Sequence, residues 1–483
     1  MKPLALPTVA LVAGLTGACA TTPTPAPETP YTVPLEWSIT HPDTVLGTTA
    51  SHWWQQFDDP QLDDLVAEAL RQSPTLGAAA ARLSAALAQA GIAGADRQPQ
   101  LGGALDSARR RQNFIGLPIP GLERDVLSNT STTQGLSVEV AWEVDLWGRL
   151  RAGRGAALAS AEAAEVDVAA VRLALVGEVA KAWYAWLEAN EQVTLAVETL
   201  DNRRQTREQI ESRYSRGLRE ALDLRLALAS EADARARLAE RRQNADGGAR
   251  RLEILLTRYP SGESLPATAT LPEITSPPAT GQPAELVTRR PDLISAELRL
   301  AASGLDVKAA RAALYPQLRL TGSVGRSSAE IADLLDNDFS VWSLAAGLLQ
   351  PLFQGGRLRS AVDLAEARRQ EAAHNYLSAA LTAFGDVEKA LAAERFLAQR
   401  LAALADATRQ SLAARDLAER RYRSGLSDYL AVLESQRQAT LNQSLLVLVR
   451  RQRLDSRIEL HLALGGDYDT GAEAPAGAAR ESS

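Results

Sequence analysis

The chain has little of what enzymes and nucleic-acid-binding proteins use. Its 483 residues include one cysteine, Cys19, so no intrachain disulfide can form. The four histidines, His41, His52, His374 and His461, are too scattered to predict a metal site. No glycine-rich phosphate loop, nucleophile elbow or basic run is found, and the net charge is −7. We therefore expect no enzyme activity, catalytic residue, cofactor, metal or nucleic-acid partner.

What is present favours a large, folded, mainly helical protein. Apolar residues make up 46% of the chain and charged residues 23%, which is typical of folded proteins and excludes general disorder. Aromatic residues are only 5%, whereas alanine and leucine, both strong helix formers, dominate.

The N-terminus predicts export. Lys2 precedes a mostly apolar run over residues 4–18, about 22 Å long as a helix, too short to span a bilayer but typical of a signal peptide. We expect a signal peptide at 1–18 and a Thr/Pro-rich tether at 19–52. The run ends Leu-Thr-Gly-Ala-Cys, which resembles a bacterial lipobox with Cys19 as the lipid attachment site. Ala20 after it points to the outer membrane. The alternative is an ordinary signal peptide beside an incidental cysteine.

The rest of the chain is a tandem duplication. Four short segments recur in the same order, first 217 and then 208 residues later: 73–76 at 290–293, 99–101 at 316–318, 148–151 at 356–359 and 213–218 at 421–426. We infer a first repeat at 53–258, a linker rich in Pro, Thr and Gly at 259–283, a second repeat at 284–466 and a flexible tail at 467–483.

Hydrophobic periodicity gives each repeat the same order of elements: helix, β-hairpin and long helical hairpin. In the first repeat, we expect a helix at 58–96, a short alternating segment to about 112, a polar loop at 113–133, a strand at 137–147, and helices at 149–213 and 222–257. In the second, we expect a helix at 284–313, strands near 316–326 and 339–350, and helices at 357–423 and 428–464.

The lengths indicate an elongated assembly. A helix over 149–213 is about 98 Å long, and two shorter helices placed end to end, 222–257 and 284–313, match it. The sum of 58–96 and 428–464 comes close to the length of 357–423 in the same way. A soluble coiled-coil bundle explains the helices but leaves the strands without a purpose.

The strands indicate a membrane barrel with a wet lumen. Along 137–147, apolar residues alternate with Glu139, Glu143 and Asp145, which we predict to face the lumen. Four strands cannot close a barrel, and open edges in lipid would leave backbone groups unpaired, so closure requires oligomers. Two copies give eight strands, and three give twelve with room for a passage. The alternative is a soluble β-hairpin with one solvated face.

The chain resembles the TolC-type outer-membrane efflux proteins, especially the NodT-like lipoprotein branch that serves resistance-nodulation-division pumps. The resemblance runs from about Trp54 to Gly466, through the motifs WEVDLWGRLR, RRPDL, PLFQGGRLR, RYRSGLSDYLAVLESQR and LALGG. It implies a homotrimer with a twelve-stranded outer-membrane barrel continued by a long periplasmic α-barrel, and no cofactor. The implied partners are a periplasmic adaptor, an inner-membrane efflux pump and outer-membrane lipid.

The resemblance also implies where a passive duct is gated and docked. A periplasmic gate is expected at Tyr422, Leu430, Glu434 and Arg437, the last three on one helical face. The hairpin tips are expected to dock the adaptor through six residues: Tyr214, Gly217, Leu218, Gly425, Leu426 and Ser427. The family usually has Leu-Gly near the end of the first repeat, where this chain has Leu256-Thr257.

The leading function is an exit duct that passively conducts small molecules, such as drugs or toxic compounds, from pump and adaptor to the exterior. One alternative within the family is a duct for secreted polypeptides. Another, from a different class, is a lipid-anchored coiled-coil scaffold without a pore.

Overall fold

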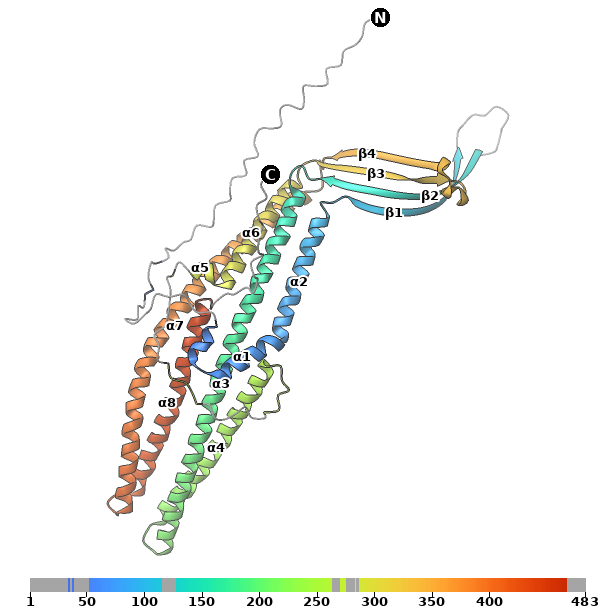
Figure 1. Ribbon diagram of the computed structural model, residues 1–483. Helices are drawn as coiled ribbons and strands as arrows, with labels where there is room; N and C mark the ends of the chain where they lie inside the picture. The colour runs from blue at the N-terminus through green and yellow to red at the C-terminus, as the bar shows by residue number, and fades with distance from the viewer. Residues whose placement is uncertain are drawn as a thin grey trace. The chain divides into compact units, whose positions relative to one another are not determined.

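The computed structural model describes residues 34, 37, 38, 52–114, 127–262, 270–274, 283 and 286–466. The expected signal peptide, Cys19, nearly all of the tether and the tail at 467–483 lie outside these residues. The described residues belong to one unit, in which a layer of long helices carries a four-stranded sheet at one end (Figure 1).

Two helices set the length of the helical layer. Helix α3 (Arg149–Ser215) and helix α7 (Arg357–Arg423) have 67 residues each, about 100 Å at 1.5 Å per residue. Helix α3 packs on α4 (Ala221–Leu255) toward the hairpin tips and on α6 (Pro291–Ala312) toward the sheet. Helix α7 packs in turn on α8 (Tyr429–Ala463) and on α6. The expected match of one long helix by two shorter ones is therefore confirmed for α3.

The short helices correct the sequence analysis at two prolines. Residues 58–96 form two helices, α1 (Pro60–Gln72) and α2 (Pro74–Ala95), instead of one, and a 3-10 turn (Trp53–Phe57) precedes them. Pro291 likewise separates α5 (Leu286–Arg289) from α6. A proline starts a new helix well, but it removes a hydrogen bond from the previous one and extends the residue before it. Helix α2 packs on α3, not on α7 of the same chain.

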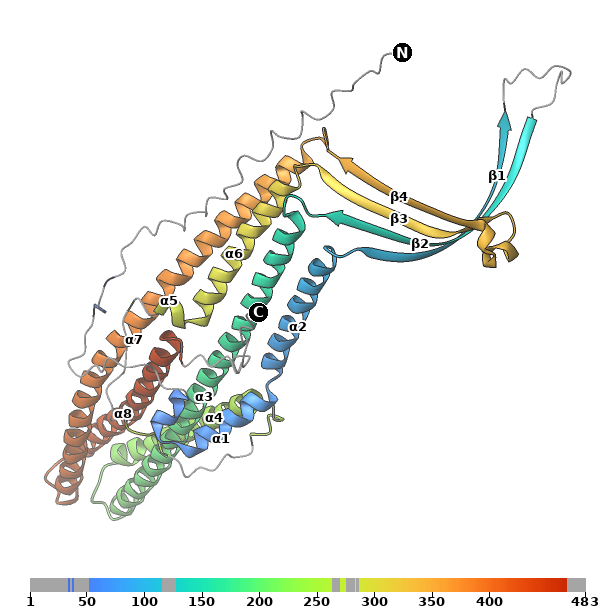
Figure 2. The ribbon, with the colours of Figure 1, turned by 45° about the horizontal axis from the view of Figure 1, so that its top comes forward.

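The sheet is an antiparallel meander in the order β1-β2-β3-β4. Strands β1 (Gln100–Phe114) and β2 (Leu127–Val144) are longer than expected and extend beyond β3 (Gln317–Ser328) and β4 (Ser340–Leu349), as Figure 2 shows. Residues 127–133, assigned to a loop from their polarity, are strand, and 145–147, assigned to a strand, are not. Both outer strands leave a backbone edge unpaired within the described chain.

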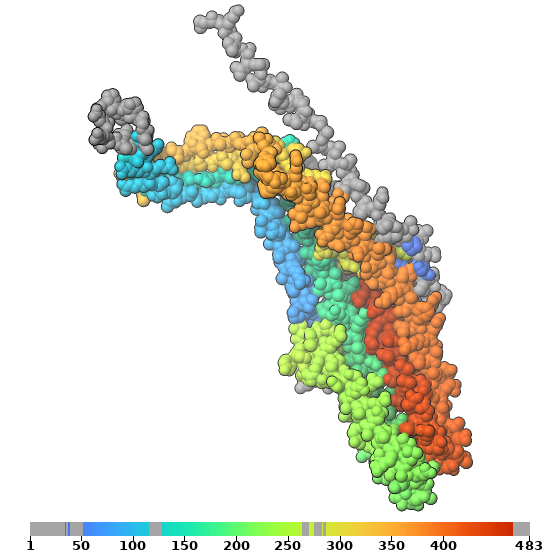
Figure 3. Space-filling view, turned by 180° about the vertical axis from the view of Figure 1, so that it is seen from behind, coloured from blue at the N-terminus to red at the C-terminus, as the bar shows by residue number. Residues whose placement is uncertain are grey.

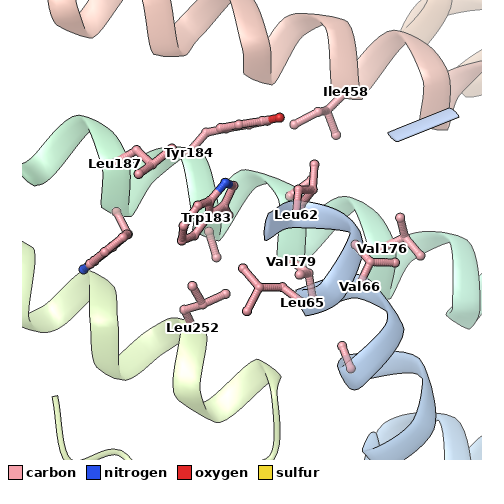
Figure 4. Close-up of a cluster of buried hydrophobic side chains, with 14 of the residues drawn as sticks. Leu62, Leu65, Val66, Val176, Val179, Trp183, Tyr184, Leu187, Leu252 and Ile458 are labelled. Carbon is pink, nitrogen blue, oxygen red and sulfur yellow. The ribbon is translucent and has the colours of Figure 1, made fainter. Parts of the chain in front are cut away.

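The main hydrophobic core lies at mid-length, where α1 crosses α3. Leu62, Leu65 and Val66 of α1 pack on Val179 and Trp183 of α3 (Figure 4). The Trp183 indole donates to the Asp59 carboxylate at 2.7 Å, and the same carboxylate caps α1 by accepting from two of its backbone N–H groups. This core fixes the short helices against the long one.

Helix α2 is long and apolar enough, by length and composition alone, to cross a membrane.

Candidate functional site: a lumen, two hairpin tips and an exposed ion pair

The register of the sheet gives it one apolar and one polar face. Directly paired residues on antiparallel strands share a face. One such row is Leu101, Val140, Gly322 and Leu344, and the next is Gly103, Val138, Val324 and Trp342. On the other face, Gly102, Glu139, Ser323 and Ser343 form a row. An apolar outer face with a polar inner one is the pattern of a membrane barrel that contains water.

The three carboxylates expected in the lumen differ in their surroundings. Glu139 lies exposed on the polar face and has no hydrogen bond among the described residues. Glu143, also on that face, binds Arg149 through both carboxylate oxygens, two of the contacts being 2.8 Å. Asp145 lies beyond the strand end and accepts from the backbone N–H of Leu150 at 3.1 Å and of Arg151 at 2.8 Å. It therefore caps α3.

Sequence reasoning missed other charges on the polar face. Asp106 lies opposite Gly135, where a Cβ atom would approach its carboxylate oxygen to 2.4 Å. The glycine therefore makes room for the acid. Arg110 and Arg319 share this face, the latter paired in register with Glu143. Strict alternation along β1 would have identified Asp106 and Arg110, and alternation along β3 would have identified Arg319.

The repeated Arg-Tyr-x-x-Gly-Leu motif ends both long helices in the same way. Gly217 and Gly425 have φ of +72° and +74°, a conformation that glycine adopts without strain. The Leu218 N–H donates to the Arg213 carbonyl, and the Leu426 N–H to the Arg421 carbonyl. These are Schellman turns. They leave the two equivalent leucines about 70% exposed at the tips.

The four expected gate residues divide into two environments. Leu430, Glu434 and Arg437 are exposed on α8, and Arg437 donates to both oxygens of Glu434, at 2.9 and 2.6 Å. This hydrogen bond lowers the pKa of Glu434 and raises the pKa of Arg437. Tyr422 is instead 4% exposed, in a small core with Ile210 and Tyr429, and burial raises its pKa.

A groove of about 480 Å³ separates the two helical hairpins on the side of the ion pair. Figure 3 shows the hairpins side by side. The groove is lined by four arginines and one carboxylate: Arg203, Arg237, Arg241, Arg437 and Asp233. Arg203 is nearly buried, and it donates to Gln436, which in turn donates to Glu419 at 2.8 Å. Burial lowers the pKa of Arg203. This chain of bonds links α3, α8 and α7, and none of it was predicted.

No group of histidines, cysteines and carboxylates able to hold a metal ion is found in the described part of the chain. What the described residues build is a sheet with one apolar and one polar face, a long helical layer, and an exposed Glu434–Arg437 ion pair on α8. Together they define a channel-forming protein of the outer membrane.

Comparison with known proteins places the chain in a family. The model of the outer membrane efflux protein family matches residues 65–257 and 283–466, one match in each repeat. The chain belongs to this family, as the resemblance predicted, and it is an outer-membrane channel of an efflux system. Its fold is that of the trimeric TolC-type channels, with a β-barrel and an α-barrel.

Relatives and solved structures agree with this over nearly the whole chain. The chain is 34% identical to the pyoverdine export outer membrane protein OpmQ of Pseudomonas putida over 93% of its own length and 95% of the relative's. It is 28% identical to the probable outer membrane lipoprotein SilC of Salmonella typhimurium, and the match covers 97% of this chain and 99% of the relative. Among solved structures, the open state of the MtrE outer membrane channel of Neisseria gonorrhoeae matches with a TM-score of 0.79 and 28% sequence identity. The match covers 93% of this chain and 99% of that one.

Proposed function

We propose that three copies of this chain close a twelve-stranded barrel and a continuous helical wall. The unpaired edges of the sheet carry this proposal, because β1 and β4 each present open backbone groups that a neighbouring copy would pair. The helices support it. Leu87 and Ile92 of α2 and Leu364 and Leu381 of α7 are more than half exposed. Within the chain α2 packs on α3, and α7 packs on α6 and α8, so each helix keeps an open apolar side. In a ring, α2 of one copy would cover α7 of the next.

The trimer would act as the passive exit duct of a tripartite pump. An inner-membrane efflux pump and a periplasmic adaptor would deliver small molecules to the tip end, and the exposed tip leucines Leu218 and Leu426 would bind the adaptor together with Tyr214 and Ser427. Leu430 and the Glu434–Arg437 pair would form rings that narrow the passage by dewetting and by charge. Efflux is favoured over polypeptide secretion because the relatives are efflux proteins.

We further propose that residues 1–18 are removed and that Cys19 carries the lipid that helps to anchor each copy. The lipobox-like residues before Cys19 support this, as does the likeness to an outer membrane lipoprotein. Residues 53–258 and 284–466 would then be the two repeats of the mature chain, joined by 259–283.

The test is to purify the full chain from outer membranes in mild detergent. Mass photometry should give three copies per particle, and planar bilayers should show discrete conductance steps. A Cys19→Ser variant should lose mass equal to the attached lipid while keeping its oligomeric state. A monomeric and electrically silent preparation would contradict the proposal.

A further inference from the structure

The apolar face of the sheet carries charge of one sign only. Three charged residues lie on this face among the described strand residues: Arg109, Arg111 and Arg326. Their pairing assigns the face: Arg109 lies opposite Thr132, Arg111 opposite Thr130, and Arg326 opposite Leu136. No carboxylate shares the face along the described parts of the four strands.

All three arginines lie at the end of the sheet away from the helices. The apolar band of β2 runs from Val144 to Leu136, about 27 Å along the strand, or roughly 21 Å in height for a strand tilted by 40°. That approaches the apolar height of an outer-membrane barrel, about 25 Å. Arg326 stands at the upper edge of the band, and Arg109 about 10 Å higher, which is the level of lipid headgroups.

The guanidinium groups are available to an anion. Arg109 makes no hydrogen bond or ion pair with the described residues. Arg111 donates once, to the Ser128 hydroxyl at 3.0 Å, and Arg326 donates to the Leu334 carbonyl and to Asn337. Each guanidinium has five N–H donors, so these bonds orient Arg111 and Arg326 and leave donors over. Arginine binds phosphate through two parallel hydrogen bonds.

We propose that this face is a binding site for a phosphorylated, glucosamine-based lipid of the outer leaflet, of the lipid A type. Phosphates on the glucosamine headgroup would bind Arg109 and Arg111, with Arg326 at the base of the headgroup, and the acyl chains would lie along the band of Val138, Val324 and Trp342 below. The proposal rests on the trimeric barrel argued above, with its apolar face toward lipid. Arg110, between the two upper arginines, faces the lumen and has no part in the site.

Arg110 makes a matched control possible, because Arg110→Gln removes the same charge from the same strand on the opposite face. Purified full-length trimers are titrated in detergent with bisphosphorylated lipid A and with enzymatically dephosphorylated lipid A, and bound lipid is counted by native mass spectrometry. We expect Arg109→Gln and Arg111→Gln each to weaken binding of the phosphorylated lipid about fivefold, the equivalent of ~1 kcal/mol. We expect Arg110→Gln to change it by less than twofold.

The inference is overturned if the dephosphorylated lipid binds as well as the phosphorylated one, or if Arg110→Gln weakens binding as much as its neighbours do. Particle mass and conductance are measured on the same preparations. Unaltered conducting trimers without the phosphate preference would refute the lipid site alone, whereas absence of trimers in the parent protein would refute the proposed function.

Discussion

The guanidinium of Arg219 lies over the ring of Tyr422, 4.4 Å from its centre, and so joins the turn of one helical hairpin to the last helical turn of the other. Arg213 approaches the same ring at 5.8 Å and donates to the Arg423 carbonyl at 3.3 Å. A cation over an aromatic ring is worth about 0.5–2 kcal/mol, more when it is shielded from water. We therefore expect Tyr422 to act by holding the tips together, and not by lining the passage.

Replacing Tyr422 tests this link. We expect Tyr422→Leu to loosen the tips and raise the frequency of open events in planar bilayers, because leucine has no ring to attract the two arginines. Tyr422→Phe is the control. The Tyr422 hydroxyl is buried without a hydrogen-bond partner among the described residues, so its removal should leave the channel closed. A leucine variant as silent as the phenylalanine variant would contradict the role.

Arg437 offers a second test, at the exposed ion pair. Arg437→Ala should release Glu434, and three unpaired carboxylates converging on the axis would repel one another. We expect a leakier closed state in single-channel recordings, with the largest effect at low salt, because the Debye length is then longest. Arg437→Lys keeps the charge and should leak less than the alanine variant. An alanine variant no leakier than the parent protein would refute this gate.

Much of the helical architecture could be predicted, because helix length and turn position are local properties. The Arg-Tyr-x-x-Gly-Leu motif specifies a helix end and a left-handed glycine wherever it occurs, and both copies adopt it. The breaks at Pro74 and Pro291 were equally local and were overlooked. The far half of the β1–β2 hairpin was hidden for another reason. Thr130 and Thr132 lie between polar residues, so both faces are polar there and no alternation remains.

The site was harder to predict because it depends on contacts between distant segments. Tyr422 is buried against Ile210 and lies beneath Arg219, both more than 200 residues away in sequence. Asp145 had the parity of a lumen residue, but the strand ends one residue earlier and the carboxylate caps a helix. Residue type and spacing identify such groups, whereas tertiary packing decides which of them face the channel.

Glu139 and Asp145 allow the lumen assignment to be tested with matched changes. Glu139→Gln removes from the polar face a carboxylate that has no hydrogen bond among the described residues. We therefore expect the cation preference of the channel, read from reversal potentials in a salt gradient, to fall. Asp145→Asn removes the same charge where it caps α3, and we expect little change in selectivity but a loss of about 1 kcal/mol in stability. Equal effects of both on selectivity would contradict the assignment.

Thr257 is expected to behave unlike an ordinary helix residue. It has φ +62° at the end of α4, the position that glycine takes in the second repeat, where Gly465 has φ +91°. Its hydroxyl donates to the Gln72 carbonyl at 3.2 Å, which offsets part of the strain. Because Ala at positive φ keeps the strain and loses the hydroxyl, we expect Thr257→Gly to be about 1 kcal/mol more stable than Thr257→Ala in urea unfolding. Inside a helix the order of stability is the reverse, because alanine is there more stable than glycine.

The equivalent glycine provides the control for that comparison. A Cβ atom at residue 465 would lie 2.8 Å from the Arg289 carbonyl oxygen, so Gly465→Ala adds a clash to the backbone strain. We expect it to lower the midpoint of unfolding more than Thr257→Ala does. If the proteins with alanine at 257 and at 465 were as stable in urea as those with glycine at the same positions, neither turn would require a residue that tolerates positive φ.

We expect His461 to make the stability of the main hydrophobic core, at mid-length, sensitive to acid. Its ring stacks on Trp53 at 5.1 Å, and burial, with a smaller effect from the Arg457 cation, lowers its pKa to about 4. In the unfolded chain the pKa is ordinary, near 6.5, so the unfolded state binds the proton more readily. The stability that this group contributes is therefore complete above pH 6.5 and is lost as the pH falls toward 4.

The variant His461→Phe keeps the stack on Trp53 and removes the titration. Between pH 7 and pH 5, we expect the free energy of unfolding of the parent protein to fall by about 2 kcal/mol more than that of the variant, measured by urea titration followed by tryptophan fluorescence. His374→Phe, at an exposed position on α7, should retain the acid sensitivity of the parent protein. If His461→Phe and the parent protein lose stability in parallel over this range, the buried imidazole is not its source, and the carboxylates of the same core become the groups to examine.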